Sequence, residues 1–275
     1  MDYRIVTDGS CDLPPELCRS KDIDVVPFYV SFDSENYMKE IVDMPIRKFY
    51  EQMVEDPTTF PKSSMPSVQD YVDVFKPVVE AGKAVICICI TTKFSGSYQS
   101  AMNAKEMLLE NYPDARITVM DSTVDTVMQG LFVLEAVKMY EAELPYEKVI
   151  EELESIKSTG RIFFTVGNID YLKHGGRIGK LAGLAGSVLG IKPLITLKEG
   201  EIFPSGVSRS RKKSLEKVFE LLWQYLQEVN AVSGEYSICV GYGYDIAEAE
   251  KFRKGAVSFL NEKGYANTDM EIQKN

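Results

Sequence analysis

The chain has 275 residues, of which 45% are hydrophobic, so it is long enough for one large domain or two modest ones. Its formal net charge of −10 argues against a protein that binds a nucleic acid backbone. No run of 18 apolar residues occurs, so no transmembrane helix is predicted. The N-terminus leads straight into a strand-like segment, so we expect no signal peptide.

The five cysteines are an odd number without the spacing of a zinc site. They predict buried free thiols in a reducing compartment, and hence a cytoplasmic protein. Two of them, Cys87 and Cys89, are two positions apart in a predicted strand and therefore share one face of it. The others are Cys11, Cys18 and Cys239.

In the first half, strand and helix patterns alternate, as in an α/β domain with a parallel sheet. Within 68–79, Pro77 predicts a kink or a new helix start. Segment 60–68 is predicted to be a turn-rich loop. The predicted strands are 3–7, 22–32, 84–90 and 116–120, and the predicted helices are 44–54, 68–79, 101–109, 130–141 and 145–157.

In the second half, hairpin and helix patterns are mixed, which is typical of an α+β domain. The turn 198–201 predicts a hairpin within 191–203. Strands are predicted at 161–166 and 236–241, a polar turn at 168–180, and helices at 181–189, 212–229 and 247–263.

The fold class that follows is α/β with two domains. Residues 1–158 are predicted to form a Rossmann-like domain with a parallel sheet. Residues 159–275 are predicted to form an α+β domain with a mixed sheet. We expect the segment around 56–80 to pack with the second domain.

The segment 84–101 is the most informative in the chain. An unbroken apolar run predicts a buried parallel strand, and a helix-forming run begins at Ala101. The hydroxyl-rich loop 91–97 between them would lie at the carboxyl end of the strand, where ligands bind in open α/β sheets. Its backbone N–H groups and the helix N-terminus favour an anion. One polar residue of loop 91–97 could merely cap the helix, but the loop contains more polar residues than a cap requires.

The loop 62–67 carries further serines. Ser67 has Asp70 three residues later, which is close to a capping box for the following helix. That interpretation leaves Ser63 and Ser64 unexplained.

The segment 171–180 suggests a nucleotide-binding P-loop, but its spacing excludes one. Three residues separate Gly175 from Gly179, where that motif needs four, and Leu181 follows the lysine instead of Ser or Thr. His174 is the only histidine and is predicted to be exposed, so no histidine-based metal site is expected.

Basic residues gather at the predicted start of helix 212–229, capped by Ser208 or Ser210. Cations oppose the macrodipole at a helix N-terminus, at a cost of about 0.3–1 kcal/mol each. The patch is either a solvated surface or a docking site for an acidic partner or a phosphate. Its residues are Arg209, Arg211, Lys212 and Lys213.

Six motifs together resemble the DegV family, the fatty-acid-binding proteins that serve bacterial fatty acid kinase. They occur in the family's order and span most of the chain. They are 7–13 (TDGSCDL), 62–67 (KSSMPS), 95–101 (SGSYQSA), 121–122 (DS), 171–178 (YLKHGGRI) and 192–195 (KPLI).

The resemblance implies a two-domain protein that buries a long-chain fatty acid between its domains and presents it to an ATP-binding kinase subunit for acyl-phosphate formation. It places the carboxylate on Ser63, Ser95 and Gly96, with Arg177 nearby. It implies no catalytic residue, no cofactor and no metal. Residues at the edge of that site would be Ser64, Thr92, Asp8 and Asp121, and the docking surface for the kinase would include Arg209, Arg211 and Lys212.

The sequence departs from the family pattern in two places. Gly9 and Cys11 stand where Ser and Ala are common, and residues 270–275 lack the family's terminal segment rich in histidine and glycine. Phosphoryl transfer that depends on that segment is therefore open. The alternative function is an enzyme that acts on a small phosphorylated metabolite in the interdomain cleft through Asp8, Asp121 and Arg177.

Overall fold

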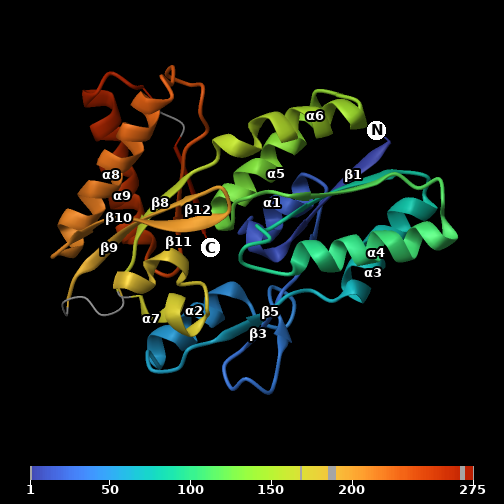
Figure 1. Cartoon of the computed structure of the whole chain (residues 1–275), viewed down its shortest axis with the longest axis horizontal. Coiled ribbons are helices and arrows are strands. Elements are labelled where there is room, and N and C mark those ends of the chain that lie inside the picture. Colours follow the sequence, from blue (N-terminus) through green and yellow to red (C-terminus); the bar gives the residue numbers. More distant parts are fainter. Residues whose placement is uncertain (1, 168, 185–189, 267–269, 275) are drawn as a thin grey trace. The chain divides into compact units, whose positions relative to one another are not determined.

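The computed structural model describes residues 2–167, 169–184, 190–266 and 270–274. Its contacts divide the chain into unit 1, Met1–Gly160, and unit 2, Arg161–Asn275. Figure 1 shows helices and strands in both units, and the predicted α/β class is confirmed.

The main sheet of unit 1 has four parallel strands in the order β2-β1-β6-β7. Ile5 of β1 lies between Ile23 of β2 and Ile86 of β6. All residues of β6 are buried, as the unbroken apolar run predicted. The strands are β1 (Tyr3–Asp8), β2 (Ile23–Val26), β6 (Ala84–Cys89) and β7 (Ile117–Asp121).

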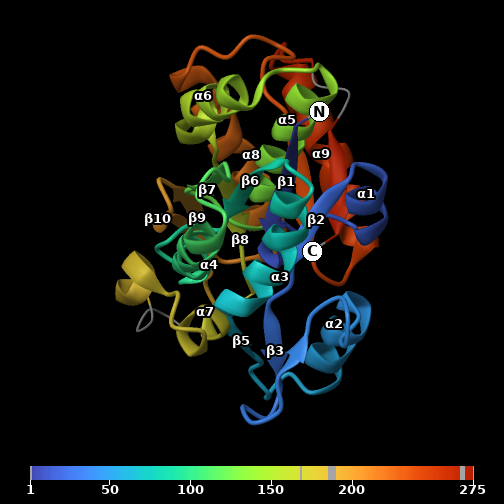
Figure 2. The ribbon, with the colours of Figure 1, turned by 90° about the vertical axis from the view of Figure 1, so that its right-hand side faces the viewer.

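Helices cover both faces of this sheet, because successive strand residues point to opposite sides. Ile86 and Ile88 pack in one cluster with residues of α5 and α6. Cys87 and Cys89 pack in the other with residues of α3 and α4, as predicted for two cysteines on one face. Figure 2 shows α3 and α4 together on one side of the strands. The helices are α1 (Pro15–Ser20), α3 (Val68–Glu80), α4 (Ser97–Asn111), α5 (Thr126–Glu141) and α6 (Tyr146–Ile156), with the short η1 (Gly9–Cys11) and η2 (Lys157–Thr159).

A second, antiparallel sheet of unit 1 has the order β4-β3-β5. Figure 2 shows it with α2 at one end of the unit. It corrects the prediction of a loop over 60–68, since pairing with β3 makes part of that segment a strand. Its elements are β3 (Tyr29–Ser31), β4 (Met38–Lys39), β5 (Lys62–Ser64) and α2 (Ile46–Glu55).

A new helix start at Pro77 is wrong, because α3 runs through this residue to Glu80, while a kink there stays a prediction. Tyr71, Phe75 and Val79 are buried along one face of the helix, and this packing outweighs the loss of one backbone hydrogen bond. The last turn is closed by Ala81 N–H, which donates to the Pro77 carbonyl at 3.1 Å.

In unit 2, three antiparallel strands have the order β10-β9-β8. The predicted hairpin is confirmed: Glu199 and Gly200 link its strands with positive φ angles of 53° and 81°. Unit 2 contains both predicted strand directions, but in two separate sheets: the β10-β9-β8 sheet is antiparallel, and β11 and β12 form a parallel pair. The strands are β8 (Ile162–Thr165), β9 (Lys192–Lys198), β10 (Glu201–Ser208), β11 (Cys239–Tyr242) and β12 (Glu271–Lys274).

The helices of unit 2 are α7 (Asp170–His174), η3 (Gly179–Leu184), α8 (Arg211–Glu228) and α9 (Ile246–Glu262). The predicted polar turn 168–180 thus contains a short helix. Of the helix predicted at 181–189, residues 181–184 are 3-10 helix, and 185–189 lie outside the described residues. Strand β12 was not predicted, since its pairing with β11 is set by residues 32 positions away along the chain.

Candidate functional site

The carboxyl end of β1 is organised by the buried carboxylate of Asp8, which has no exposed surface. Its Oδ2 accepts hydrogen bonds from the Ile90 N–H at 3.0 Å and the Ser97 hydroxyl at 2.6 Å. Its Oδ1 accepts from Gln129 at 2.8 Å and from Ser10 at 2.7 Å. Burial raises the pKa of Asp8 above its ordinary value, although these four donors oppose the rise. Asp8 therefore holds together the ends of β1 and β6 and the starts of α4 and α5.

The loop 91–97 leads from β6 into α4, whose N-cap is Gly96. Ser97 is buried, and its hydroxyl lies 2.6 Å from the Tyr71 hydroxyl as well as from Asp8. Ser95 is half-buried, and its hydroxyl accepts a hydrogen bond from the Ser97 N–H at 3.2 Å. The first turn of α4 carries no acidic side chain, so the positive end of the helix dipole is not neutralised from within the helix.

A second polar junction lies at the carboxyl end of β7. The Thr92 hydroxyl donates to Asp121 Oδ2 at 2.7 Å, and the Thr123 N–H donates to Asp121 Oδ1 at 2.8 Å. Thr92 is exposed. Asp121 therefore fixes the loops after β6 and β7 to each other.

Two serines of loop 62–67, Ser63 and Ser64, lie on strand β5, and both are exposed. The loop touches loop 91–97, because a Cβ atom added to Gly96 would lie 2.6 Å from the Met65 Sδ. Unit 1 thus brings together the two hydroxyl-rich loops, through residues that lie 31 positions apart in the sequence. The predicted capping box is confirmed: Ser67 and Asp70 bond reciprocally at the start of α3.

Arg177 lies in unit 2, in the turn that follows α7. Its side chain is exposed and its guanidinium donates to the Gly175 carbonyl at 2.5 Å. His174 is exposed, as predicted. The contribution of Arg177 to a site that includes Ser63 and Ser95 stays a prediction.

The basic patch begins α8, and Ser210 is its cap, accepting from the Lys213 N–H at 3.3 Å. Arg209 is exposed. Arg211 forms an ion pair with Glu248 at 2.7 Å, and Lys212 lies 4.0 Å from Glu216. Arg211 is thus partly engaged within unit 2.

Sequence patterns did not reveal a group of acidic side chains in unit 1. Burial raises the pKa of Asp12, and the carboxylates of Glu40 and Asp125 raise it further. Burial also raises the pKa of Glu40, and the carboxylate of Asp8 adds to that rise. Burial raises the pKa of Asp125 to about 7. A side chain at position 9 would displace the Glu40 carboxylate, since the Glu40 Oε1 lies 1.7 Å from where a Gly9 Cβ would stand. Only the position of Asp12 within motif 7–13 could have hinted at this group.

The partners of Asp8 were missed as well. Gln129 donates to Asp8 directly, and Tyr71 reaches it only through the hydroxyl of Ser97. Both sit in helices where their side chains count as ordinary core, and no local pattern marks them as partners of a distant carboxylate. Over the residues that the structure describes, no group of three or more His, Cys, Asp or Glu could hold a metal ion. None of the described helices is both long and apolar enough to cross a membrane.

The fold and the site define a two-unit α/β protein with a hydroxyl-lined helix N-terminus suited to an anion. The family model described as an uncharacterised protein of the DegV family matches residues 2–271. A DegV domain-containing protein of Listeria innocua is 31% identical over 251 residues, which cover 91% of this chain and 85% of that protein. The chain therefore belongs to the DegV family, and the predicted resemblance is confirmed.

Solved structures agree. A stearic-acid-binding protein from Eubacterium ventriosum is 46% identical, with a TM-score of 0.90 over 94% of this chain and 88% of that one. A fatty-acid-binding DegV family protein from Thermus thermophilus is 27% identical, with a TM-score of 0.83 over 100% of this chain and 92% of that one.

Proposed function

We propose that the protein binds a long-chain fatty acid and presents its carboxylate to a kinase partner. The observation that carries the proposal is the contact between loops 62–67 and 91–97 at the N-terminus of α4. Similarity to the stearic-acid-binding protein from Eubacterium ventriosum supports the choice of ligand.

In this proposal the carboxylate accepts hydrogen bonds from the hydroxyls of Ser63 and Ser95 and from the backbone at Gly96, with Arg177 supplied by unit 2. Hydroxyls and a helix N-terminus stabilise an anion without burying a full positive charge. Four residues lie at the edge of this site: Ser64, Thr92, Asp8 and Asp121. The two aspartates contribute by fixing the loops that carry the binding groups.

The acyl chain supplies most of the affinity. At about 0.8 kcal/mol per buried CH₂, a long chain contributes on the order of ten kcal/mol before ordering costs. The fatty acid is the only ligand that this chain itself binds in the proposal, with no cofactor and no metal of its own.

The kinase partner supplies ATP, because the segment 171–180 lacks the spacing of a P-loop. A carboxylate oxygen of the bound lipid attacks the γ-phosphorus of ATP, the bond to the β–γ bridging oxygen breaks, and acyl phosphate and ADP form. In this proposal the partner docks on Arg209, Arg211 and Lys212, and both proteins are cytoplasmic.

The alternative, an enzyme for a phosphorylated metabolite, is less well supported. Its two carboxylates, Asp8 and Asp121, already accept several hydrogen bonds from the protein. A carboxylate that is fully engaged in this way is poorly placed to act as a general base.

The test is denaturing extraction of the purified protein, followed by mass spectrometry of the extract. We expect a fatty acid of 14–18 carbons, in the range that gives the acyl-chain affinity above. The Ser63→Ala, Ser95→Ala double variant should retain less of it than a Ser20→Ala, Ser155→Ala control, whose exposed serines bond only to nearby carbonyls. An empty extract, together with no uptake of added palmitate or oleate, would rule out lipid binding.

A further inference from the structure

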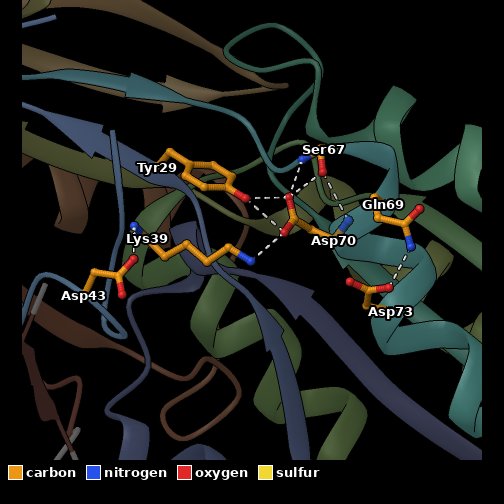
Figure 3. A network of polar contacts seen from close by, with 7 residues as sticks. All are labelled: Tyr29, Lys39, Asp43, Ser67, Gln69, Asp70 and Asp73. Carbon is orange, nitrogen blue, oxygen red and sulfur yellow. Dashed lines mark hydrogen bonds and ion pairs between the residues drawn. The ribbon is translucent and has the colours of Figure 1, made fainter. Parts of the chain in front are cut away.

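The carboxylate of Asp70 is the centre of a polar network at the start of α3 (Figure 3). The residue is only 8% exposed. Its Oδ2 accepts from the Ser67 N–H at 2.8 Å and the Ser67 hydroxyl at 2.6 Å. The Tyr29 hydroxyl lies 3.0 Å from both oxygens, and the Lys39 ammonium lies 2.7 Å from Oδ1.

This arrangement exceeds what helix capping requires. A capping box needs only the reciprocal bonds between Ser67 and Asp70. Tyr29 and Lys39 come instead from strands β3 and β4, 41 and 31 residues earlier in the chain. The Lys39 ammonium also lies 5.5 Å from the centre of the Tyr29 ring. Asp70 therefore ties the β4-β3-β5 sheet to helix α3.

The tie reaches the proposed carboxylate site through strand pairing. Tyr29 lies opposite Ser64, and Val30 lies opposite Ser63, in the antiparallel pair of β3 and β5. The chain leaves β5 at Ser64 and enters α3 after Ser67. The carboxylate of Asp70 thus holds the Ser67 end of the intervening segment directly and the Ser64 end through Tyr29.

The next residue of α3 reaches the other loop. The hydroxyl of Tyr71 lies 2.6 Å from that of Ser97, which donates to Asp8. The first turn of α3 therefore contacts, through adjacent residues, the sheet that carries Ser63 and the loop that carries Ser95.

We propose that Asp70, with Lys39 and Tyr29, is a positioning residue that sets loop 62–67 against loop 91–97 for recognition of the ligand's carboxylate. The inference rests on the proposed function. Its consequence concerns the head of the ligand and not the tail: loss of the network should weaken the binding of the carboxylate and leave the apolar chain's contribution unchanged.

The experiment compares the binding of palmitic acid with that of hexadecanol, which has the same chain and no carboxylate, by displacement of a fluorescent fatty-acid analogue. The test variants are Asp70→Asn and Lys39→Met. Asp73→Asn is the matched control, because it makes the same change one turn further along α3, where Asp73 is exposed and bonds only to Gln69. Figure 3 shows both sites.

We expect the preference for acid over alcohol to fall about tenfold in each test variant, while hexadecanol binding stays unchanged. A tenfold fall is the effect of weakening a hydrogen bond to a charged group. Asp73→Asn should keep the wild-type preference. A purely structural role would lower binding of acid and alcohol equally, and that result would overturn the inference.

The outcomes also separate the inference from the proposed function. If Ser63→Ala, Ser95→Ala removes the acid preference while Asp70→Asn and Lys39→Met keep it, the positioning role is wrong and the carboxylate site stands. If the wild-type protein itself shows no preference for the acid, the proposed site fails and the inference fails with it.

Discussion

Replacement of Asp8 by alanine tests whether this carboxylate holds the candidate site together. The substitution removes the acceptor of four donors that come from different loops and helices of unit 1. Three of them keep a second partner: Ser97 keeps Tyr71, Ser10 keeps the side-chain Oε1 of Gln129, and the Gln129 amide N–H keeps Thr7. The Ile90 N–H loses its acceptor in the core of the unit.

The magnitude follows from these contacts. A buried donor left without an acceptor costs about 1–3 kcal/mol, and each of the other lost hydrogen bonds costs about 1 kcal/mol. Removal of a desolvated carboxylate, whose pKa burial raises, offsets part of this loss. We therefore expect Asp8→Ala to lower the free energy of unfolding by about 3–5 kcal/mol, a large share of the 5–15 kcal/mol typical of a protein. Asp8→Asn keeps an acceptor oxygen and should cost about 1–2 kcal/mol.

The assay is equilibrium unfolding in urea followed by far-ultraviolet circular dichroism, with Asp114→Ala as the control. Asp114 is exposed, so its replacement should change the free energy of unfolding by no more than about 0.5 kcal/mol. A loss below about 1 kcal/mol for Asp8→Ala would refute the reasoning, because the orphaned Ile90 N–H alone should exceed it.

Two further predictions concern the contact between the loops and the pH dependence of stability. Gly96→Ala places a Cβ atom 2.6 Å from the Met65 Sδ. Because Met65 is flexible and 46% exposed, the free energy of unfolding should change by less than about 1 kcal/mol, yet palmitate should bind several-fold more weakly. Adding Met65→Ala should restore affinity in a displacement assay; unchanged affinity in Gly96→Ala would contradict the contact's role. For Asp125, burial raises the folded-state pKa to about 7 from 3.8, so the folded state binds more protons between these values. The stability that Asp125 contributes through this raised pKa is fully present below about pH 4 and is lost as the pH rises through 7. The free energy of unfolding falls by at most about 4 kcal/mol over this range. Asp125→Asn should flatten the decline in a series of urea unfolding curves across this range, and an unaltered slope would show that Asp125 is not its source.

Some features of this protein are determined by short stretches of sequence, because their physical cause is local. The apolar run of β6 has no polar face, so it must be buried on both sides, and the structure confirms this. Ser67 and Asp70 have the spacing of a capping box and form one. Glu199 and Gly200 adopt the positive φ angles of a tight hairpin turn.

Other features depend on partners that are distant in the chain, and no local pattern reveals them. Strand β5 consists of Lys62–Ser64, a polar and exposed segment that becomes a strand only by pairing with β3. Pro77 remains helical because side chains on the same face pack against the sheet. Strand β12 exists through its pairing with β11.

The candidate site divides in the same way. The sequence by itself determined which residue types are present: hydroxyls before a helix, and an anion-favouring N-terminus. Only the tertiary structure decided that Met65 lies against Gly96, that Asp8 binds groups from four segments, and that Asp70 serves strands as well as its own helix. The reason is that helix caps and turns are stabilised by neighbours in the chain, whereas a buried carboxylate takes whichever donors the packing of distant elements brings within reach.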